Sequence, residues 1–237
     1  MHPEPVRLEL HPAPDHRVVA DRLPGTRPAF VWLHGLCSVR GGEKSHALFE
    51  LAARLGREAW RFDFRGHGES SQALRDTTLS DLLDDANAVL AQAGRSWLVG
   101  SSLGGLVAAW IAARQPQSVE GLVLLAPALQ FLPRMRAMAR NDGRITLAHA
   151  TGLIEFGPRM HDDLAGFDER ELAAAIAAPT FIAHGESDDS VPLAASEDFV
   201  ARLAAGRRRL LVVPHGDHRL NREIAAILAA AGEFHGW

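Results

Sequence analysis

Residues 98–110 read LVGSSLGGLVAAW, and this stretch carries the strongest local signal in the chain. Leu98 and Val99 have the character of a buried strand end, whereas residues 106–110 have that of an apolar helix. Between them the chain must turn within residues 100–104, which are glycines, serines and one leucine. So tight a strand-to-helix turn costs conformational energy. It either saves space or holds one serine in a strained, exposed position.

Two serines compete for that position. Gly100-x-Ser102-x-Gly104 fits the G-x-S-x-G pattern of a nucleophile elbow, in which glycines let strand and helix approach and push the serine hydroxyl outward. The first turn of the following helix favours negative charge that develops at this hydroxyl. Ser101 lacks the flanking glycines. The sequence therefore predicts Ser102 as a candidate nucleophile, and a Gly-Ser turn that only packs is the alternative.

Apolar segments with strand character alternate with helical segments along the chain. The expected strands are Val6–Leu10, Val18–Ala20, Ala29–Gly35, Ala59–Phe64, Ser96–Gly100, Leu122–Leu129, Thr180–Gly185 and Arg209–Pro214. The expected helices with both bounds read from the pattern are Glu43–Leu55, Leu79–Ala93, Leu103–Gln115 and Leu220–Ala231. The second of these is expected to be capped by Ser80 or an aspartate. A further helix is expected to start at Asp168, with a capping box to Glu171, and to end before Pro179. This pattern predicts an α/β fold with a mostly parallel, twisted, eight-stranded sheet and helices on both faces.

Size and composition narrow the class of protein. The 237 residues suffice for one sizeable core, and we expect a single domain over residues 1–237. The net charge of −4 is spread along the chain, which argues against a nucleic-acid partner or an anionic membrane surface. The single cysteine excludes an internal disulfide. The first ten residues lack the apolar core of a signal peptide and no apolar run reaches membrane-spanning length, so the expected location is the cytoplasm.

One long segment, residues 131–178, interrupts the alternation between two core strands. It is too long for one crossover helix, and it mixes prolines and glycines with apolar residues. A surface crossover that only packs is one interpretation. We expect instead a lid insertion over Ser102, with Leu153, Ile154 and Phe156 forming the apolar wall of a substrate pocket.

Candidate partners for Ser102 follow the last two expected strands. A serine hydroxyl becomes a good nucleophile when a base, usually a histidine oriented by a carboxylate, takes its proton. HGESDDSVP at 184–192 supplies carboxylates after one strand, and PHGDHRL at 214–220 supplies two histidines after the last. Both segments lie at carboxyl ends of strands, where ligands bind in such sheets. Ordinary loop polarity is the alternative for each segment alone.

Taken together, these motifs resemble the α/β-hydrolase fold family over nearly the whole chain. VWLHGL (31–36) is similar to the strand and oxyanion loop of that family, and FDFRGHGES (62–70) is similar to its D-x-R-G-H-G-x-S segment. HGESDDSVP (184–192) is similar to its acid motif, H-G-x-x-D-x-x-V-P, and GDHRL (216–220) is similar to its terminal histidine motif. The resemblance implies that Ser102 is the nucleophile, Asp188 the acid and His218 the base. Alternatives for the acid and the base are Asp189, Glu186 and His215.

An acyl-transfer reaction also needs hydrogen-bond donors for the oxygen that becomes negative. By the resemblance, these donors are the backbone N–H groups of Leu36 and Leu103. We interpret His34 as a structural residue that shapes the oxyanion loop, and His67 likewise as structural. Cys37 is interpreted as a small loop residue, because it lacks the elbow that a nucleophile needs.

Two further segments, HGLCSVRGGEKSHAL (34–48) and LIEFGPRM (153–160), resemble a subgroup of small serine hydrolases that includes acyl-protein thioesterase-like and depalmitoylase-like enzymes. The expected function is hydrolysis of a small-molecule carboxylic ester or thioester through an acyl-enzyme, without a metal or an organic cofactor. C–C bond hydrolysis, perhydrolysis and a non-catalytic binding or signalling role on the same fold are the alternatives. Dehalogenation is disfavoured, because dehalogenases carry an aspartate where this chain has Ser102.

Overall fold

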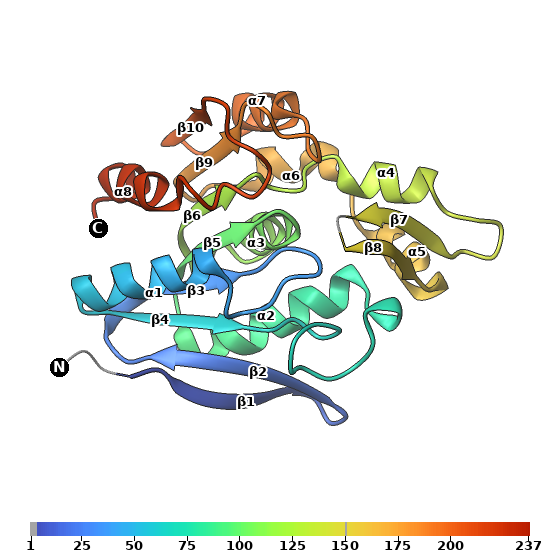
Figure 1. Ribbon diagram of the computed structural model, residues 1–237, viewed down its shortest axis with the longest axis horizontal. Coiled ribbons are helices and arrows are strands. Elements are labelled where there is room, and N and C mark those ends of the chain that lie inside the picture. Colours follow the sequence, from blue (N-terminus) through green and yellow to red (C-terminus); the bar gives the residue numbers. More distant parts are fainter. Residues whose placement is uncertain (1–3, 150) are drawn as a thin grey trace.

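The computed structural model describes residues 4–149 and 151–237, and its centre is one eight-stranded sheet (Figure 1). The strand order is β1-β2-β4-β3-β5-β6-β9-β10. These strands are β1 (Val6–Ala13), β2 (His16–Leu23), β3 (Thr26–Leu33), β4 (Arg57–Phe62), β5 (Ser96–Ser101), β6 (Val119–Leu125), β9 (Thr180–Gly185) and β10 (Arg208–Val213). Strand β2 is antiparallel to both β1 and β4, whereas every other neighbouring pair is parallel. The expected mostly parallel sheet of eight strands is confirmed.

Helices cover both faces of this sheet. One face carries α1 (Glu43–Leu55) and α8 (Ile224–His235), and the other carries α2 (Leu79–Ala93), α3 (Leu103–Arg114), α6 (Glu169–Ala175) and α7 (Leu193–Arg202). Successive side chains along β3 point to opposite faces of the sheet. Phe30 and Trp32 therefore pack toward α1 and α8, whereas Val31 and Leu33 pack toward α2 and α3. None of the helices that the structure describes is long and apolar enough to cross a bilayer.

The helix boundaries correct the sequence prediction at three places. Helix α2 is capped by Thr78, not by Ser80 or an aspartate, because the Thr78 hydroxyl accepts from the Asp81 amide while the Asp81 carboxylate accepts from the Thr78 amide. Helix α7 was not predicted at all. Helix α8 begins at Ile224 rather than Leu220, because Leu220 has a φ of +52°, which is incompatible with a right-handed helix.

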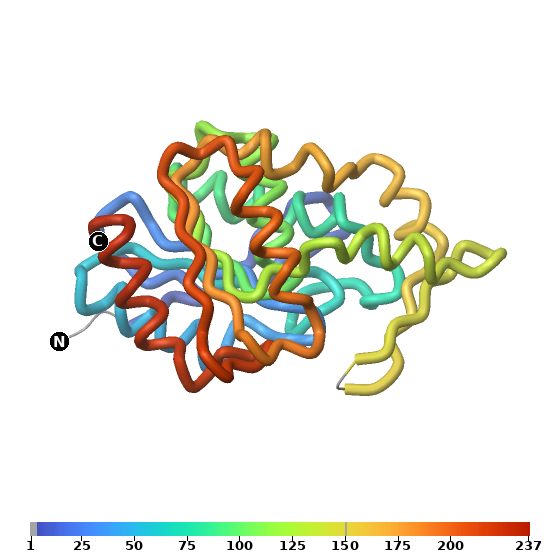
Figure 2. Tube along the Cα trace, turned by 90° about the horizontal axis from the view of Figure 1, so that it is seen from above, coloured from blue at the N-terminus to red at the C-terminus, as the bar shows by residue number. Residues whose placement is uncertain are grey.

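The insertion, residues 131–178, has more regular structure than the sequence suggested. It contains α4 (Phe131–Ala137), an antiparallel hairpin of β7 (Ile145–His149) and β8 (Gly152–Phe156), α5 (Pro158–Asp163) and α6. Asp168 caps α6 as expected, but its carboxylate accepts from the Arg170 amide, and no hydrogen bond to Glu171 completes the expected capping box in the described part of the chain. In Figures 1 and 2 the hairpin projects from the end of the molecule opposite the two termini.

Candidate active site

The turn between β5 and α3 holds Ser102 in a strained conformation. Ser102 has a φ of +51°, which side-chain-bearing residues rarely adopt. A Cβ atom at Gly100 would lie 2.4 Å from the Gly104 carbonyl oxygen, and one at Gly104 would lie 2.1 Å from the Leu33 carbonyl oxygen. Both glycines are therefore required for the crossing of β5, α3 and β3. Ser101 is buried, at 5% exposure, whereas Ser102 is partly exposed.

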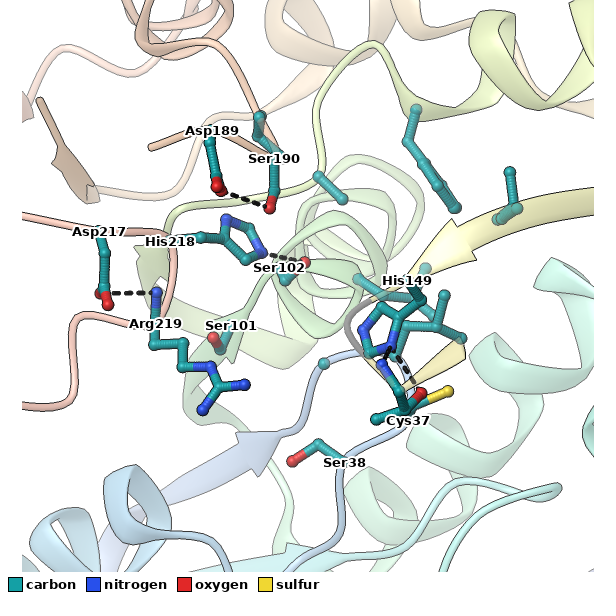
Figure 3. Close-up of a pocket in the computed structure, with 18 of the residues that line it drawn as sticks. Cys37, Ser38, Ser101, Ser102, His149, Asp189, Ser190, Asp217, His218 and Arg219 are labelled. Carbon is teal, nitrogen blue, oxygen red and sulfur yellow. Dashed lines mark hydrogen bonds between the residues drawn. The ribbon is translucent and has the colours of Figure 1, made fainter. Parts of the chain in front are cut away.

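Ser102 meets His218 at the carboxyl end of the sheet. The His218 Nε2 atom lies 3.0 Å from the Ser102 Oγ atom (Figure 3). The His218 Nδ1 atom lies 2.8 Å from Asp188 Oδ2. With the proton on Nδ1 and donated to the carboxylate, Nε2 has a free lone pair for the serine hydroxyl. The structure thus brings the three residues that the sequence singled out into one chain of hydrogen bonds, the arrangement of a nucleophile, a base and an orienting acid.

The Asp188 carboxylate is fully enclosed and held from four sides. Its Oδ1 accepts from the Ser190 and Val191 amides, each at 2.9 Å, and its Oδ2 faces both His218 and His184, the latter at 3.1 Å. Burial alone would raise the pKa of Asp188, but hydrogen bonds from His184, His218 and the Val191 amide outweigh burial and hold the pKa well below its ordinary value. Asp188 is therefore a stable anion beneath His218.

His184 is a site residue to which the sequence analysis gave no role. It is completely buried in β9, with Nδ1 2.8 Å from the Ser196 hydroxyl and Nε2 3.0 Å from the Val191 carbonyl oxygen. Because the neighbours of Nε2 are a carbonyl and a carboxylate, Nε2 carries the proton and Ser196 donates to Nδ1. The available signal was its position four residues before Asp188, at the start of the acid motif.

The alternative acids and base lie outside this chain of hydrogen bonds. Asp189 accepts from the Ser190 hydroxyl at 3.0 Å, and Glu186 accepts from the His215 amide at 3.0 Å. The His215 side chain is 95% exposed. Geometry therefore favours Asp188 and His218 over these neighbours.

A cleft of about 930 Å³ opens above Ser102. Its lining mixes apolar and polar side chains. Phe131, Met138, Leu147 and Ala148 give the insertion an apolar wall, which also carries Arg134, His149 and Thr151. The rest of the lining combines apolar residues, among them Leu36, Cys37, Val39 and Leu103, with polar ones, among them Lys44, Asp189, Asp217, Arg219 and Asn221. Ser102 and His218 belong to the same lining, so a ligand bound at the serine can contact both kinds of side chain (Figure 3).

The expected pocket residues of the insertion are wrong. Strand β7 pairs Leu147 with Ile154, and β7 contacts α4, whereas β8 contacts the short 3-10 helix at Leu74–Asp76. Ile154 and Phe156 are therefore buried beneath the hairpin, and Leu153, on the opposite face, is 80% exposed. The insertion lines the cleft through Phe131, Arg134, Met138, Leu147, Ala148, His149 and Thr151 instead.

The two residues whose backbone N–H groups are the expected oxyanion donors, Leu36 and Leu103, belong to the lining of the cleft. Leu36 follows β3 and Leu103 is the first residue of α3, and both line the cleft. Within residues 4–149 and 151–237, neither amide donates a hydrogen bond. The Leu103 amide is one of the free donors that every helix has at its N-terminus. Both groups are thus free to bind a negatively charged oxygen, as the sequence predicts.

His34 fixes the orientation of one of these donors. Its ring is fully buried, Nδ1 donates to the Gly35 carbonyl oxygen at 2.8 Å, and Nε2 accepts from the Phe64 amide at 3.0 Å. The Gly35 carbonyl and the Leu36 N–H belong to one planar peptide and point in opposite directions, so holding the first also aims the second. Burial lowers the pKa of His34 to about 3, so the ring is neutral.

His67 and Cys37 lie outside the hydrogen-bonded chain around Ser102. The buried His67 ring packs edge-on against His34, with 5.0 Å between ring centroids, and its Nδ1 lies 3.2 Å from the Arg65 carbonyl oxygen. Cys37 lines the cleft from the loop after β3 with a φ of +54°. In the part of the chain that the structure describes, no group of three histidine, cysteine, aspartate or glutamate side chains is placed to hold a metal ion.

Comparison with known proteins agrees with this geometry. Residues 28–144 match the family described as alpha/beta hydrolase fold. A protein of Agrobacterium vitis S4 with a known crystal structure is 30% identical, covers 98% of each chain and has a TM-score of 0.82. The rat palmitoyl-protein thioesterase ABHD10, mitochondrial, is 26% identical over 212 residues, 84% of this chain and 71% of that protein. The esterase Rv0045c of Mycobacterium tuberculosis is 32% identical over 141 residues, 56% of this chain and 44% of its own length.

The chain belongs to the α/β-hydrolase fold family. Its relatives with assigned activities include an esterase and a thioesterase, and the protein is accordingly a hydrolase. The expected resemblance to small esterases and acyl-protein thioesterases is confirmed by the same relatives.

Proposed function

We propose that this hydrolase cleaves carboxylic esters or thioesters by forming an acyl-enzyme on Ser102. The observation that carries the proposal is the chain of hydrogen bonds from Ser102 Oγ through His218 to Asp188, at 3.0 and 2.8 Å. It places a base on the hydroxyl and an anion behind the base, and the hydroxyl opens into a cleft.

In the acylation half-reaction, the Ser102 oxygen attacks the substrate carbonyl carbon while its proton passes to His218 Nε2. The carbonyl oxygen becomes negative and accepts hydrogen bonds from the Leu36 and Leu103 amides. The Asp188 anion stabilises the imidazolium, to which it stays hydrogen-bonded. Collapse of the tetrahedral intermediate expels the alcohol or thiol, which takes its proton from His218.

In the deacylation half-reaction, His218 acts again as the base. Water loses a proton to Nε2 and attacks the acyl-enzyme carbonyl, and the same two amides bind the oxyanion. The carboxylic acid then leaves and Ser102 regains its proton. Each step uses only groups already positioned around Ser102.

The insertion supports an acyl chain as the apolar part of the substrate. Phe131, Met138 and Leu147 give the cleft an apolar wall, and a lid that excludes water would favour acyl groups long enough to reach it. The printed names of the relatives, a palmitoyl-protein thioesterase and an esterase, include both a thioester and an ester activity. We therefore propose both bond types as substrates.

The experiment is a panel of p-nitrophenyl esters and acyl-thioesters graded by chain length, measured on the parent enzyme and on Ser102→Ala. The proposal predicts hydrolysis of at least one series by the parent and none above background by the variant. Activity confined to C–C bond cleavage or to perhydrolysis would move the function to another reaction of the same residues. A folded parent without any activity would favour a non-catalytic binding role.

A further inference from the structure

Three cationic side chains line the cleft without an ionic partner. They are Lys44 on α1, Arg134 on α4 and Arg219 in the loop after β10. Within the described residues, no carboxylate oxygen lies within 4.0 Å of any of these three cations. Arg134 lies on the insertion and donates to the Ser190 carbonyl oxygen at 3.2 Å, whereas Lys44 is joined to the residue after His218 by its hydrogen bond to the Arg219 carbonyl oxygen.

Lys44 is half-buried, and its ammonium donates to the Arg219 carbonyl oxygen at 2.5 Å. Burial lowers the pKa of Lys44 to about 8, although Asp217 and Glu43 act in the opposite direction. Asp217 and Glu43 thus compensate the cost of burying this cation only in part, and an anionic ligand bound to Lys44 would offset the rest.

Arg219 directly follows His218 in the chain. Its side chain extends along the cleft toward Ser101 and Ser38 (Figure 3). Its backbone amide is bound by Asp217 Oδ1 at 3.0 Å, but its guanidinium makes no hydrogen bond to any residue that the structure describes. The planar group therefore has all of its donors free for a carboxylate or a phosphate.

The nearby carboxylates do not neutralise these donors. Asp217 Oδ1 is occupied by the Arg219 and Leu220 amides, and Asp189 accepts from the Ser190 hydroxyl. Glu43 lies on α1 beside Lys44, beyond ion-pair distance among the described residues. The polar part of the lining thus has acidic groups engaged with neighbouring backbone and hydroxyl groups, a Lys44 ammonium with one hydrogen bond to a carbonyl oxygen, and an Arg219 guanidinium with none among the described residues.

We propose that the leaving group of the substrate carries a carboxylate or a phosphate, which Lys44 and Arg219 bind. This inference rests on the proposed acyl-enzyme function. The leaving atom must face His218 Nε2, because it takes its proton from that nitrogen. Arg219 follows His218 in the chain, Lys44 donates to the Arg219 carbonyl oxygen, and all three residues line the cleft, so we assign these two cations to the leaving group. The apolar wall at Met138 and Leu147 is then left for the acyl chain.

The test compares acyl esters of one chain length with three leaving groups: 4-carboxyphenyl, 4-(phosphonooxy)phenyl and the neutral 4-carbamoylphenyl. Each kcat/KM is divided by the rate constant for hydroxide-catalysed hydrolysis of the same ester. This division corrects the comparison for differences in the intrinsic reactivity of the three esters. A charge-assisted hydrogen bond contributes roughly a factor of ten, so the parent should prefer an anionic ester over the neutral one by about tenfold. The larger of the two anionic preferences identifies carboxylate or phosphate as the recognised group.

Lys44→Met and Arg219→Met should each lower this anionic-to-neutral ratio by roughly threefold to tenfold. Arg219→Glu should reverse the preference. The matched control is Arg95→Met, which removes the same charge from an exposed arginine paired with Glu120, away from the cleft. It should leave the ratio unchanged, whereas added salt should lower the ratio of the parent.

An anionic-to-neutral ratio near one in the parent, or equal ratios in all variants, would overturn the proposed anion site. The neutral ester keeps the two proposals separate. If the parent hydrolyses the 4-carbamoylphenyl ester and shows no preference for anions, only the leaving-group inference fails. If no ester of any charge is hydrolysed, the acyl-enzyme function itself fails.

Discussion

His184 Nε2 lies 3.1 Å from the Asp188 oxygen that also receives His218 Nδ1, so one carboxylate oxygen serves two imidazoles. The other oxygen of Asp188 is held by two backbone amides. Because His184 is buried, its tautomer is set by the oxygens that face Nε2, and Ser196 holds its Nδ1, it acts as a rigid support behind the acid. It is a positioning residue, since its effect on Ser102 passes through Asp188 and His218.

Replacing His184 should therefore lower kcat more than it changes KM. In His184→Phe, Asp188 loses one hydrogen bond and the orientation of His218 loosens, and we expect kcat to fall roughly tenfold. Thermal unfolding monitored alongside separates this effect from loss of the fold. A parent-like kcat in a stable His184→Phe would show that the two amides hold Asp188 sufficiently.

The assignment of the acid is tested by a pair of neighbouring substitutions. Asp188→Asn removes the anion beneath His218 and favours the wrong tautomer, so kcat should fall by several orders of magnitude, on the order of 10⁴-fold. Asp189→Asn is the matched control, because Asp189 contacts only the Ser190 hydroxyl among the hydrogen bonds of the described residues. Near-normal turnover by Asp188→Asn would transfer the role of acid to another carboxylate.

The buried His34 should make the protein sensitive to acid. Its folded-state pKa is about 3, below its ordinary value of 6.5, so the unfolded state binds the proton first. The free energy of unfolding should therefore decrease as pH falls from about 6.5 toward 3, by up to about 1.4 kcal/mol per pH unit from this residue.

His34→Gln removes that titration, and the gap in stability between parent and variant should narrow as pH falls. Denaturant unfolding of both proteins at pH 7, 6, 5 and 4 measures this difference in the free energy of unfolding. His67, which packs on His34, has a pKa that burial also lowers, but it is present in both proteins and cancels in the comparison. Parallel stability curves for the two proteins would contradict the role assigned to His34.

The apolar wall of the cleft should set the preference for acyl chain length. Leu147→Ala and Met138→Ala remove cleft-lining side chains and should reduce kcat/KM for long chains by roughly 1–3 kcal/mol, with hydrolysis of an acetate ester less affected. Leu153→Ala, on the exposed face of the hairpin, should leave the chain-length profile as in the parent. If Leu153→Ala shifts the profile and Leu147→Ala does not, the hairpin contacts the acyl chain by its other face.

The strands and the approach of the two loops to the Ser102 turn could be predicted from short local patterns, whereas the choice of Asp188 and His218 within those loops came from the resemblance to the α/β-hydrolase fold family. Continuous apolar runs mark buried parallel strands, and the carboxyl ends of such strands share one edge of the sheet. The glycines around Ser102 are required because a Cβ atom at Gly104 would lie only 2.1 Å from the Leu33 carbonyl oxygen, so their signal in the sequence is direct.

The insertion could not be predicted to the same depth, because its structure depends on which element each strand packs against. The alternation in ITLA and LIEF is compatible with a hairpin, but only the packing of β8 against Leu74–Asp76 decides that Ile154 is buried away from the cleft. Helix α7 was missed for a related reason. Its buried positions, such as Ala195 and Phe199, directly follow the acid motif, and the segment was interpreted only as an extension of that loop.

The acyl-enzyme on Ser102 is tested most directly by labelling with a fluorophosphonate probe, followed by peptide mass spectrometry of the parent, Ser102→Ala and Ser101→Ala. The activated hydroxyl should be the one that reacts, because among the hydroxyls of residues 4–149 and 151–237 only that of Ser102 is hydrogen-bonded to His218 Nε2. The account predicts one adduct, on Ser102, in the parent and in Ser101→Ala, and none in a folded Ser102→Ala. An adduct on Ser101, or undiminished labelling of Ser102→Ala, would contradict it.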